Sequence, residues 1–259
     1  MTSCFSDTKT NIEIAELDTL CPRFVQKPAI YTFEYKDIKL EALLISFDMN
    51  AFQPFFYQRL NIIYTPQLQK SVTKRQAEFL AGRLCVKLLM HRLLGYSTPV
   101  PISPDRSPSW PVGVTGSISH SNNHAIATLT QNQNKKTNIS LGVDIQEIIT
   151  SEQSDHIHTL ISTPNEIALL QKNGLSLKCA TTLLFSAKEA IYKSIYPHIK
   201  EIIGFNSVAL IELNITEQKL TFSPSITLCK QFGISRNIYC QYRNTEDSNA
   251  IITFCIYQQ

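Results

Sequence analysis

The sequence predicts an α+β protein made of two halves with similar organisation. Two observations indicate this class: segments with helix-type apolar spacing alternate with short strand-type runs, and the order strand, helix, strands occurs twice along the 259 residues. Hydrophobic residues make up 43% of the chain, which is enough to bury a core. We expect the halves at residues 1–135 and 136–259, joined by the polar run 131–138, which is typical of a surface loop.

The first half is expected to contain a strand, a long helix, a proline-rich loop and a hairpin, at residues 40–47, 73–95, 99–113 and 117–130. Thr73 and Gln76 resemble a capping box at the start of the helix, and Gly95 favours its end. In the hairpin, two strand-type runs flank Asn122 and Asn123, because asparagine tolerates the positive φ that such turns need.

The second half begins with a strand at residues 141–145. Two helices follow, Pro164–Lys172 and Leu177–Tyr196, and Pro197 is expected to end the second of them. Further strand-type runs lie at residues 207–215, 219–228, 237–243 and 250–258. The strands near 117–130 and 139–146 are placed where they can pair across the midpoint of the chain.

Charge and cysteine content exclude several classes of function. Lys and Arg number 24 against 21 Asp and Glu, and the resulting net charge of +3 is too small to indicate a nucleic-acid-binding protein. The 7 cysteines are scattered and form no C-x-x-C pair, so we expect reduced, mostly buried thiols. The first residues show no secretory signal, and no run approaches about 18 apolar residues, so we expect a cytoplasmic protein without a transmembrane segment.

The run LGVDIQ, residues 141–146, places a carboxylate in a predicted strand. Alternation puts Gly142, Asp144 and Gln146 on one face and apolar residues on the other. A carboxylate on an otherwise apolar strand is costly to bury without a partner. Asp144 is therefore either a strand-end residue that caps a neighbouring loop or a ligand for a hard cation.

The run FSAKEAIYK, residues 185–193, crowds Lys188, Glu189 and Lys193 into one stretch of a predicted helix. One interpretation is a solvated pair of Glu189 and Lys193 at helical spacing, which would stabilise the helix by about 0.2–0.5 kcal/mol. The other is a site in which one carboxylate, flanked by two ammonium groups, holds a metal and phosphates together.

Two further segments contain candidate anion ligands. In GSISHSNNH, residues 116–124, small residues and the Ser119 hydroxyl beside His120 can hold a phosphate, whereas the asparagine turn argues against a helical zinc pair. Arg75 lies in the first turn of the predicted helix, where free backbone N–H groups favour anions. Arg83 follows on the same helix, and Arg106 lies in the proline-rich loop. The alternative interpretation of the basic residues on the helix is that they form a solvated face and bind no ligand.

Taken together and in this order, these segments resemble the 4′-phosphopantetheinyl transferases of the surfactin-type and enterobactin-synthetase-component-D-like branch. The matching segments are KRQAEFLAGR (74–83), R-x-P-x-W-P-x-G-x-x-GSISH (106–120), LGVDIQ (141–146) and FSAKEAIYK (185–193). The resemblance implies a monomer with two α+β halves related by a pseudo-two-fold axis and coenzyme A bound between them. It also implies transfer of 4′-phosphopantetheine from coenzyme A to a serine of an apo acyl, peptidyl or aryl carrier protein. Mg²⁺ is then required and 3′,5′-ADP is released, and enterobactin-type siderophore biosynthesis is the implied pathway.

The resemblance assigns roles to individual residues. Asp144 and Glu189 fall on the metal carboxylates, and Glu189 is our hypothesis for the base that activates the serine. Lys188 and Lys193 match lysines around the pyrophosphate, where either can stabilise the transition state. Glu166 aligns with an acidic position of the branch. The residues that match contacts to the phosphates of coenzyme A are Arg75, Arg83, Arg106, Ser119 and His120.

Gln146 departs from the family pattern, which usually has a glutamate two residues after the aspartate. We expect one of three outcomes: Gln146 binds the metal through its carbonyl oxygen, water takes its place, or the metal is bound more weakly. The departure motivates an alternative function, a non-catalytic module that binds coenzyme A or a carrier protein. A Mg²⁺-dependent phosphohydrolase is a third hypothesis.

Overall fold

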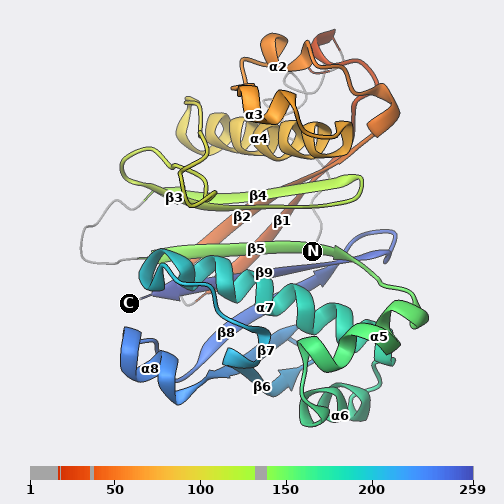
Figure 1. The fold of residues 1–259 in the computed structure, drawn as a ribbon, viewed down its shortest axis with the longest axis vertical. Helices are drawn as coiled ribbons and strands as arrows, with labels where there is room; N and C mark the ends of the chain where they lie inside the picture. The colour runs from red at the N-terminus through yellow and green to blue at the C-terminus, as the bar shows by residue number, and fades with distance from the viewer. Residues whose placement is uncertain (1–16, 18, 36–37, 132–138, 259) are drawn as a thin grey trace. The chain divides into compact units, whose positions relative to one another are not determined.

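The computed structural model describes residues 17, 19–35, 38–131 and 139–258. The chain divides into two compact units, Met1–Gln133 and Asn134–Gln259, and each has its own hydrophobic core. Each unit carries a long helix on an antiparallel sheet (Figure 1), so the predicted α+β class with two halves of similar build is confirmed. Most of the predicted connecting loop, residues 132–138, lies outside the described residues.

The first unit contains an antiparallel sheet with the strand order β1-β2-β4-β3. The strands are β1 (Val25–Tyr35), β2 (Ile38–Phe47), β3 (Val114–Ser121) and β4 (His124–Gln131). The helical segments are η1 (Met49–Ala51), α2 (Phe56–Arg59), α3 (Pro66–Gln69) and α4 (Thr73–Leu94). Helix α4 packs against β2, β3 and β4. The edge strand β1 was not among the predicted elements.

The long helix of this unit, α4, ends as predicted and begins differently. Gly95 has φ 77° and closes the last turn, which a glycine does without steric cost. The predicted capping box is wrong: Val72 is the N-cap residue, without a side-chain cap, and Thr73 is already helical. Gln76 instead donates from Nε2 to the carbonyl oxygens of Gln69 and Ser71, which ties the segment before the helix to its first turn.

The predicted hairpin is confirmed. Strands β3 and β4 pair from Val114 opposite Gln131 to Ser121 opposite His124, and Asn122 in the turn has φ 46°. Lys74 Nζ on α4 donates to Asn122 Oδ1 at 3.3 Å. The turn between β3 and β4 therefore lies next to the first turns of α4.

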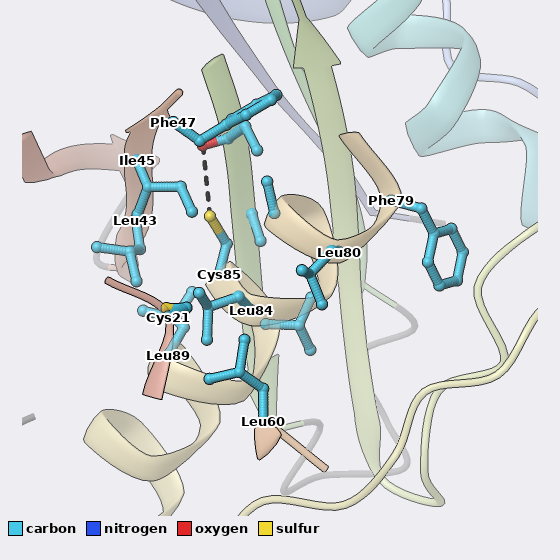
Figure 2. Close-up of a cluster of buried hydrophobic side chains, with 14 of the residues drawn as sticks. Cys21, Leu43, Ile45, Phe47, Leu60, Phe79, Leu80, Leu84, Cys85 and Leu89 are labelled. Carbon is cyan, nitrogen blue, oxygen red and sulfur yellow. Dashed lines mark hydrogen bonds between the residues drawn. The ribbon is translucent and has the colours of Figure 1, made fainter. Parts of the chain in front are cut away.

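The core of the first unit lies between α4 and the sheet (Figure 2). Leu80, Leu84 and Leu89 of the helix pack with Leu43 and Ile45 of β2, and all five are buried. Cys85 is also buried and donates from Sγ to the carbonyl oxygen of Ala125 at 3.3 Å. Among the described residues, Cys21, Cys85, Cys240 and Cys255 are free and buried.

The second unit contains an antiparallel sheet with the strand order β5-β9-β8-β7-β6. The strands are β5 (Ile139–Glu147), β6 (Val208–Asn214), β7 (Lys219–Pro224), β8 (Ile238–Asn244) and β9 (Ala250–Gln258). The helical segments are α5 (Ser151–Ile161), α6 (Pro164–Lys172), α7 (Leu177–Ile199), η2 (Phe205–Ser207) and α8 (Ile226–Phe232). The predicted pairing of residues 139–146 with residues 117–130 is wrong, because β3 and β4 belong to the sheet of the first unit. Strand β5 pairs instead with β9 along its whole length, from Ile139 opposite Gln258 to Glu147 opposite Ala250.

Three helices of the second unit were not predicted as the structure has them: α7, α8 and α5. Pro197 lies inside α7, which runs on to Ile199, because a proline this close to the end removes one hydrogen bond without stopping the last turn. The run 219–228 is a strand only as far as Pro224, since Ser225 caps α8 by accepting from the N–H of Leu228. Helix α5 was not predicted. Among the described residues, none of the helices has the length and apolarity that crossing a membrane requires.

Candidate functional site

Strand β5 and helix α7 bring Asp144, Glu189 and Lys193 together. Asp144 is 5% exposed on β5, and Lys193 Nζ lies 2.7 Å from its Oδ1. Lys193 also donates to the carbonyl oxygen of Val143 at 3.2 Å. Because Lys193 is partly exposed, the buried carboxylate is linked through it to the surface of the unit.

Gly142 makes this approach of helix and strand possible. A Cβ atom at Gly142 would lie 1.8 Å from the carbonyl oxygen of Ala190 and 3.0 Å from the backbone nitrogen of Ser194, both on α7. The face of β5 that carries Gly142 therefore lies directly against the helix. Asp144 and Gln146 follow at two-residue intervals, so alternation places them on the same face.

The charges in this cluster act on one another. Burial raises the pKa of the Glu189 carboxyl; the positive charge of Lys193 lowers this pKa and the negative charge of Asp144 raises it. Two carboxyl groups of a strand and a helix thus share one partly buried site with an ammonium group. A carboxylate whose pKa is raised can take a proton more readily, and a pair of carboxylates attracts a hard cation.

The donor set fits Mg²⁺. Protein sites for Mg²⁺ commonly supply one or two carboxylates and leave the other positions to water and substrate phosphates. Asp144 and Glu189 meet this description, and Gln146 adds an amide on the same strand face, with Nε2 donating to the carbonyl oxygen of Glu147. No group of three or more His, Cys, Asp or Glu side chains that could hold a metal ion occurs in the described part of the chain.

Gln146 also lines a groove beside this cluster. The other lining residues come from the segment after β5 and from helices α5 and α7: Ile149, Glu152, Gln153, His156, Ile157, Thr182 and Phe185. Helix α5 forms one wall, and its start is held by a capping box in which Thr150 accepts from the N–H of Gln153 and the Gln153 side chain accepts from the N–H of Thr150.

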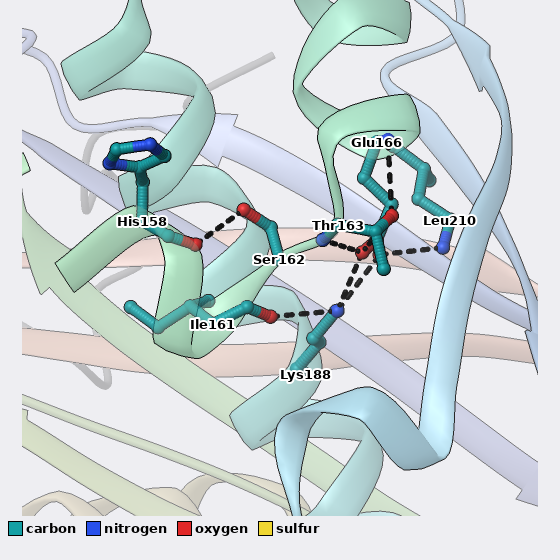
Figure 3. Close-up of polar contacts among 7 residues, drawn as sticks. All are labelled: His158, Ile161, Ser162, Thr163, Glu166, Lys188 and Leu210. Atoms are coloured by element: carbon teal, nitrogen blue, oxygen red, sulfur yellow. Dashed lines mark hydrogen bonds and ion pairs between the residues drawn. The ribbon is translucent and has the colours of Figure 1, made fainter.

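Lys188 occupies a different place from Lys193 (Figure 3). Its side chain is 1% exposed, and Nζ lies 2.8 Å from Glu166 Oε1 and donates to the carbonyl oxygen of Ile161 at 2.9 Å. Glu166 also accepts from the backbone N–H groups of Thr163 and Leu210. This network ties α7 to the end of α5, the start of α6 and the start of β6. The buried ion pair does not favour the predicted contact of Lys188 with a pyrophosphate.

In the first unit, α4 and β3 form a basic cluster around His120. Arg75 Nη1 lies 2.8 Å from His120 Nε2, and Glu78 Oε2 lies 3.5 Å from His120 Nδ1. Lys74 also belongs to this cluster, because its Nζ lies 3.9 Å from Glu78 Oε1. Ser119 is buried and, as the neighbour of His120 on a strand, points to the opposite face of the sheet. Sequence reasoning missed Glu78, although it lies inside the matched run KRQAEFLAGR.

Arg83 lies two turns after Arg75 on α4 and faces a pocket. Burial lowers the pKa of its guanidinium to about 10, with a further contribution from Arg75. The guanidinium lies over the Phe79 ring, 4.6 Å from its centroid, and within the described residues its buried Nε has no hydrogen-bond partner. An arginine with an unsatisfied donor on a pocket wall suits an anionic ligand.

Arg106 is exposed in the proline-rich loop. Its backbone has φ 67° and its N–H donates to the carbonyl oxygen of Ser103 at 2.8 Å, so the loop makes a tight turn at this residue. The loop is held to the sheet by Trp110, whose ring lies so close to Gly116 of β3 that a Cβ atom there would be 2.6 Å from it.

Known proteins resemble this chain over both units. The family described as "4'-phosphopantetheinyl transferase N-terminal domain" matches residues 64–130, and the "4'-phosphopantetheinyl transferase superfamily" matches residues 140–255. Enterobactin synthase component D of Salmonella typhi is 31% identical over 70% of this chain and 73% of its own length. The Escherichia coli K12 protein of that name is 33% identical over 63% of this chain and 76% of its own length. A 4'-phosphopantetheinyl transferase of Nocardia iowensis is 31% identical over 53% of this chain and 60% of its own length.

Proposed function

The chain belongs to the 4′-phosphopantetheinyl transferase superfamily, and on this basis we propose that it transfers 4′-phosphopantetheine from coenzyme A to a serine of an apo carrier protein. The reaction is proposed to require Mg²⁺ and to release 3′,5′-ADP. The observation that carries the proposal is the cluster of Asp144, Glu189 and Lys193 in the second unit. The carrier is an acyl, peptidyl or aryl carrier domain. Similarity to enterobactin synthase component D supports a role in siderophore biosynthesis.

The residues proposed to hold Mg²⁺ are Asp144 and Glu189, with Gln146 as a further oxygen donor. When bound, the ion neutralises negative charge on the pyrophosphate of coenzyme A. Lys193, already 2.7 Å from Asp144, supplies positive charge beside the same phosphates.

The chemical step follows from the charges of the site. The serine oxygen of the carrier attacks the β-phosphorus, a new P–O bond forms, and the bond to the bridging oxygen breaks, so that 3′,5′-ADP leaves. A neutral serine is a weak nucleophile and must lose its proton to a base. Glu189 is proposed as that base, directly or through a water, and its raised pKa supports this role.

The residues of the first unit are proposed to bind the phosphates of coenzyme A. Arg75 and His120 form one basic cluster, and Arg83 presents an unsatisfied donor nearby on the same helix. Arg106 and Ser119 are proposed from the resemblance. Ser119 would contribute through its backbone, because its side chain points away from His120.

A carrier-loading assay tests the function. The purified protein is incubated with coenzyme A, Mg²⁺ and a panel of apo carrier domains, and each carrier is weighed by mass spectrometry. We expect a gain of one phosphopantetheine on at least one carrier, lost when its acceptor serine is replaced by alanine. A non-catalytic module would bind coenzyme A without a mass gain, and a phosphohydrolase would release 3′,5′-ADP without a carrier; either result would contradict the proposal.

Gln146→Glu is expected to strengthen metal binding. The change adds a third carboxylate to a donor set of two, and a carboxylate is a better Mg²⁺ ligand than a neutral amide. The Mg²⁺ concentration for half-maximal transfer should fall by about tenfold, which corresponds to about 1.4 kcal/mol. Gln153→Glu, in the wall of the neighbouring groove, is the matched control and should leave that concentration unchanged. An unchanged requirement in Gln146→Glu would show that position 146 does not contact the ion.

A further inference from the structure

Glu78 is an acidic residue inside the basic cluster of the first unit, and the proposed function gives it no role. It is 7% exposed and lies on α4 one turn after Lys74 and Arg75. Burial raises the pKa of its carboxyl, while Lys74 and Arg75 act in the opposite direction and favour the ionised form. A negative charge among bases weakens anion binding unless it serves one of those bases.

The contacts of His120 define which of its nitrogens carries a proton. Arg75 Nη1 lies 2.8 Å from His120 Nε2, and because a guanidinium only donates, Nε2 must accept. The neutral ring therefore carries its proton on Nδ1, the nitrogen that lies 3.5 Å from Glu78 Oε2. A carboxylate on this side favours the same tautomer and restrains the ring, as carboxylates do for histidines that bind metals.

We propose that Glu78 is a positioning residue for His120, which it orients with Nε2 toward a phosphate monoester, the 3′-phosphate of coenzyme A. The inference rests on the proposed function, in which Arg75 and His120 bind that phosphate. When the phosphate accepts from Arg75, Nε2 of His120 must gain a proton before it can donate to the anion as well. The imidazolium then lies beside the charges of Arg75 and Lys74, and Glu78 offsets their repulsion.

Two substitutions separate the parts of this role. Glu78→Met removes the carboxylate at similar side-chain length, and Glu78→Gln removes the charge but keeps an oxygen that can accept from Nδ1. Glu41→Met is the matched control, because Glu41 is also a partly buried glutamate of this unit with a basic partner, Arg92 at 2.7 Å. Glu41 lies on β2 and pairs with Thr32 of β1. It is far along β2 from Ser46, the residue that pairs with His124 beside the turn between β3 and β4. The control site is therefore away from the cluster around His120.

Kinetics distinguish positioning from a general structural role. Glu78→Met should raise the KM for coenzyme A about tenfold and change kcat less than about twofold, in line with the loss of one charge-assisted contact. The KM for 3′-dephospho-coenzyme A should not change. Glu78→Gln should give an intermediate KM for coenzyme A, and Glu41→Met should match the native protein. An equal rise in KM for both substrates in Glu78→Met would overturn the proposal.

The protonation of His120 is read directly by ¹⁵N NMR of the imidazole. The free native protein should show the proton on Nδ1, and its complex with 3′,5′-ADP should show both nitrogens protonated, whereas the complex with 5′-AMP should not. In Glu78→Met the doubly protonated form should be reduced. A proton on Nε2 in the free protein would overturn the proposal. The free-protein spectrum does not depend on transfer, so a failed loading assay would count against the proposed function alone.

Discussion

Asp144→Ala and Glu189→Gln should each lower the rate of phosphopantetheine transfer by about 10³-fold or more, even at saturating Mg²⁺. Glu189→Gln keeps the shape of the side chain but removes the proposed base and replaces one carboxylate ligand by a weaker neutral amide. Asp144→Ala removes the other carboxylate and leaves Lys193 without the partner that lies 2.7 Å away. The rate is measured as carrier mass gain against time, with coenzyme A and carrier in excess.

The controls for these variants separate chemistry from folding. Circular dichroism should show native secondary structure in both. Because burial raises the pKa of Glu189, its ionised form is disfavoured in the folded protein, so Glu189→Gln should not lower the free energy of unfolding. Glu217→Gln removes an exposed glutamate paired with Lys219 in the same unit and should keep native turnover. Native-like turnover in Asp144→Ala or Glu189→Gln would refute the assignment of these residues.

Gly142→Ala is expected to have the largest effect on folding. The added Cβ would lie 1.8 Å from the carbonyl oxygen of Ala190, which is a backbone atom of α7, and the Cβ itself is fixed to the backbone of β5. Neither can move away without displacing the helix from the sheet. We expect a loss of about 4 kcal/mol or more in the free energy of unfolding, together with loss of transfer, because Glu189 and Lys193 lie on the displaced helix.

Gly204→Ala is the matched control for this substitution. A Cβ atom at Gly204 meets nothing within 4 Å, and its φ of −79° suits alanine. Its stability should therefore change by less than about 1 kcal/mol, with a small gain expected from the lower entropy of the unfolded chain. The comparison uses chemical denaturation followed by circular dichroism. Equal stabilities of the two variants would contradict the close contact between β5 and α7.

Elements with strong local signals could be predicted from the sequence. The αL residue Gly95 ends α4, and Asn122 forms the turn between β3 and β4, because each requires a backbone conformation that few residues adopt. Elements whose local signals compete were predicted less well. Ser225 starts a helix in a run that reads as a strand, and Thr73 resembles a cap but lies inside its helix. In the first case the Ser225 hydroxyl caps the helix by accepting from the N–H of Leu228, and in the second Val72 takes the N-cap position.

The residue pattern alone predicted the class of the fold, its two halves, the family resemblance and the acidic residues proposed for the metal. It did not distinguish Lys188 from Lys193, which lie on one helix near the same glutamate. Five residues turn an α-helix by about 140° beyond a full turn, so the two ammonium groups leave α7 in different directions. Only tertiary packing decided that Lys188 meets Glu166 in a buried corner and Lys193 meets Asp144. Likewise, only the packing of α4 on β3 placed Glu78 beside His120, because charges far apart in a chain become partners through the contacts of the elements that carry them.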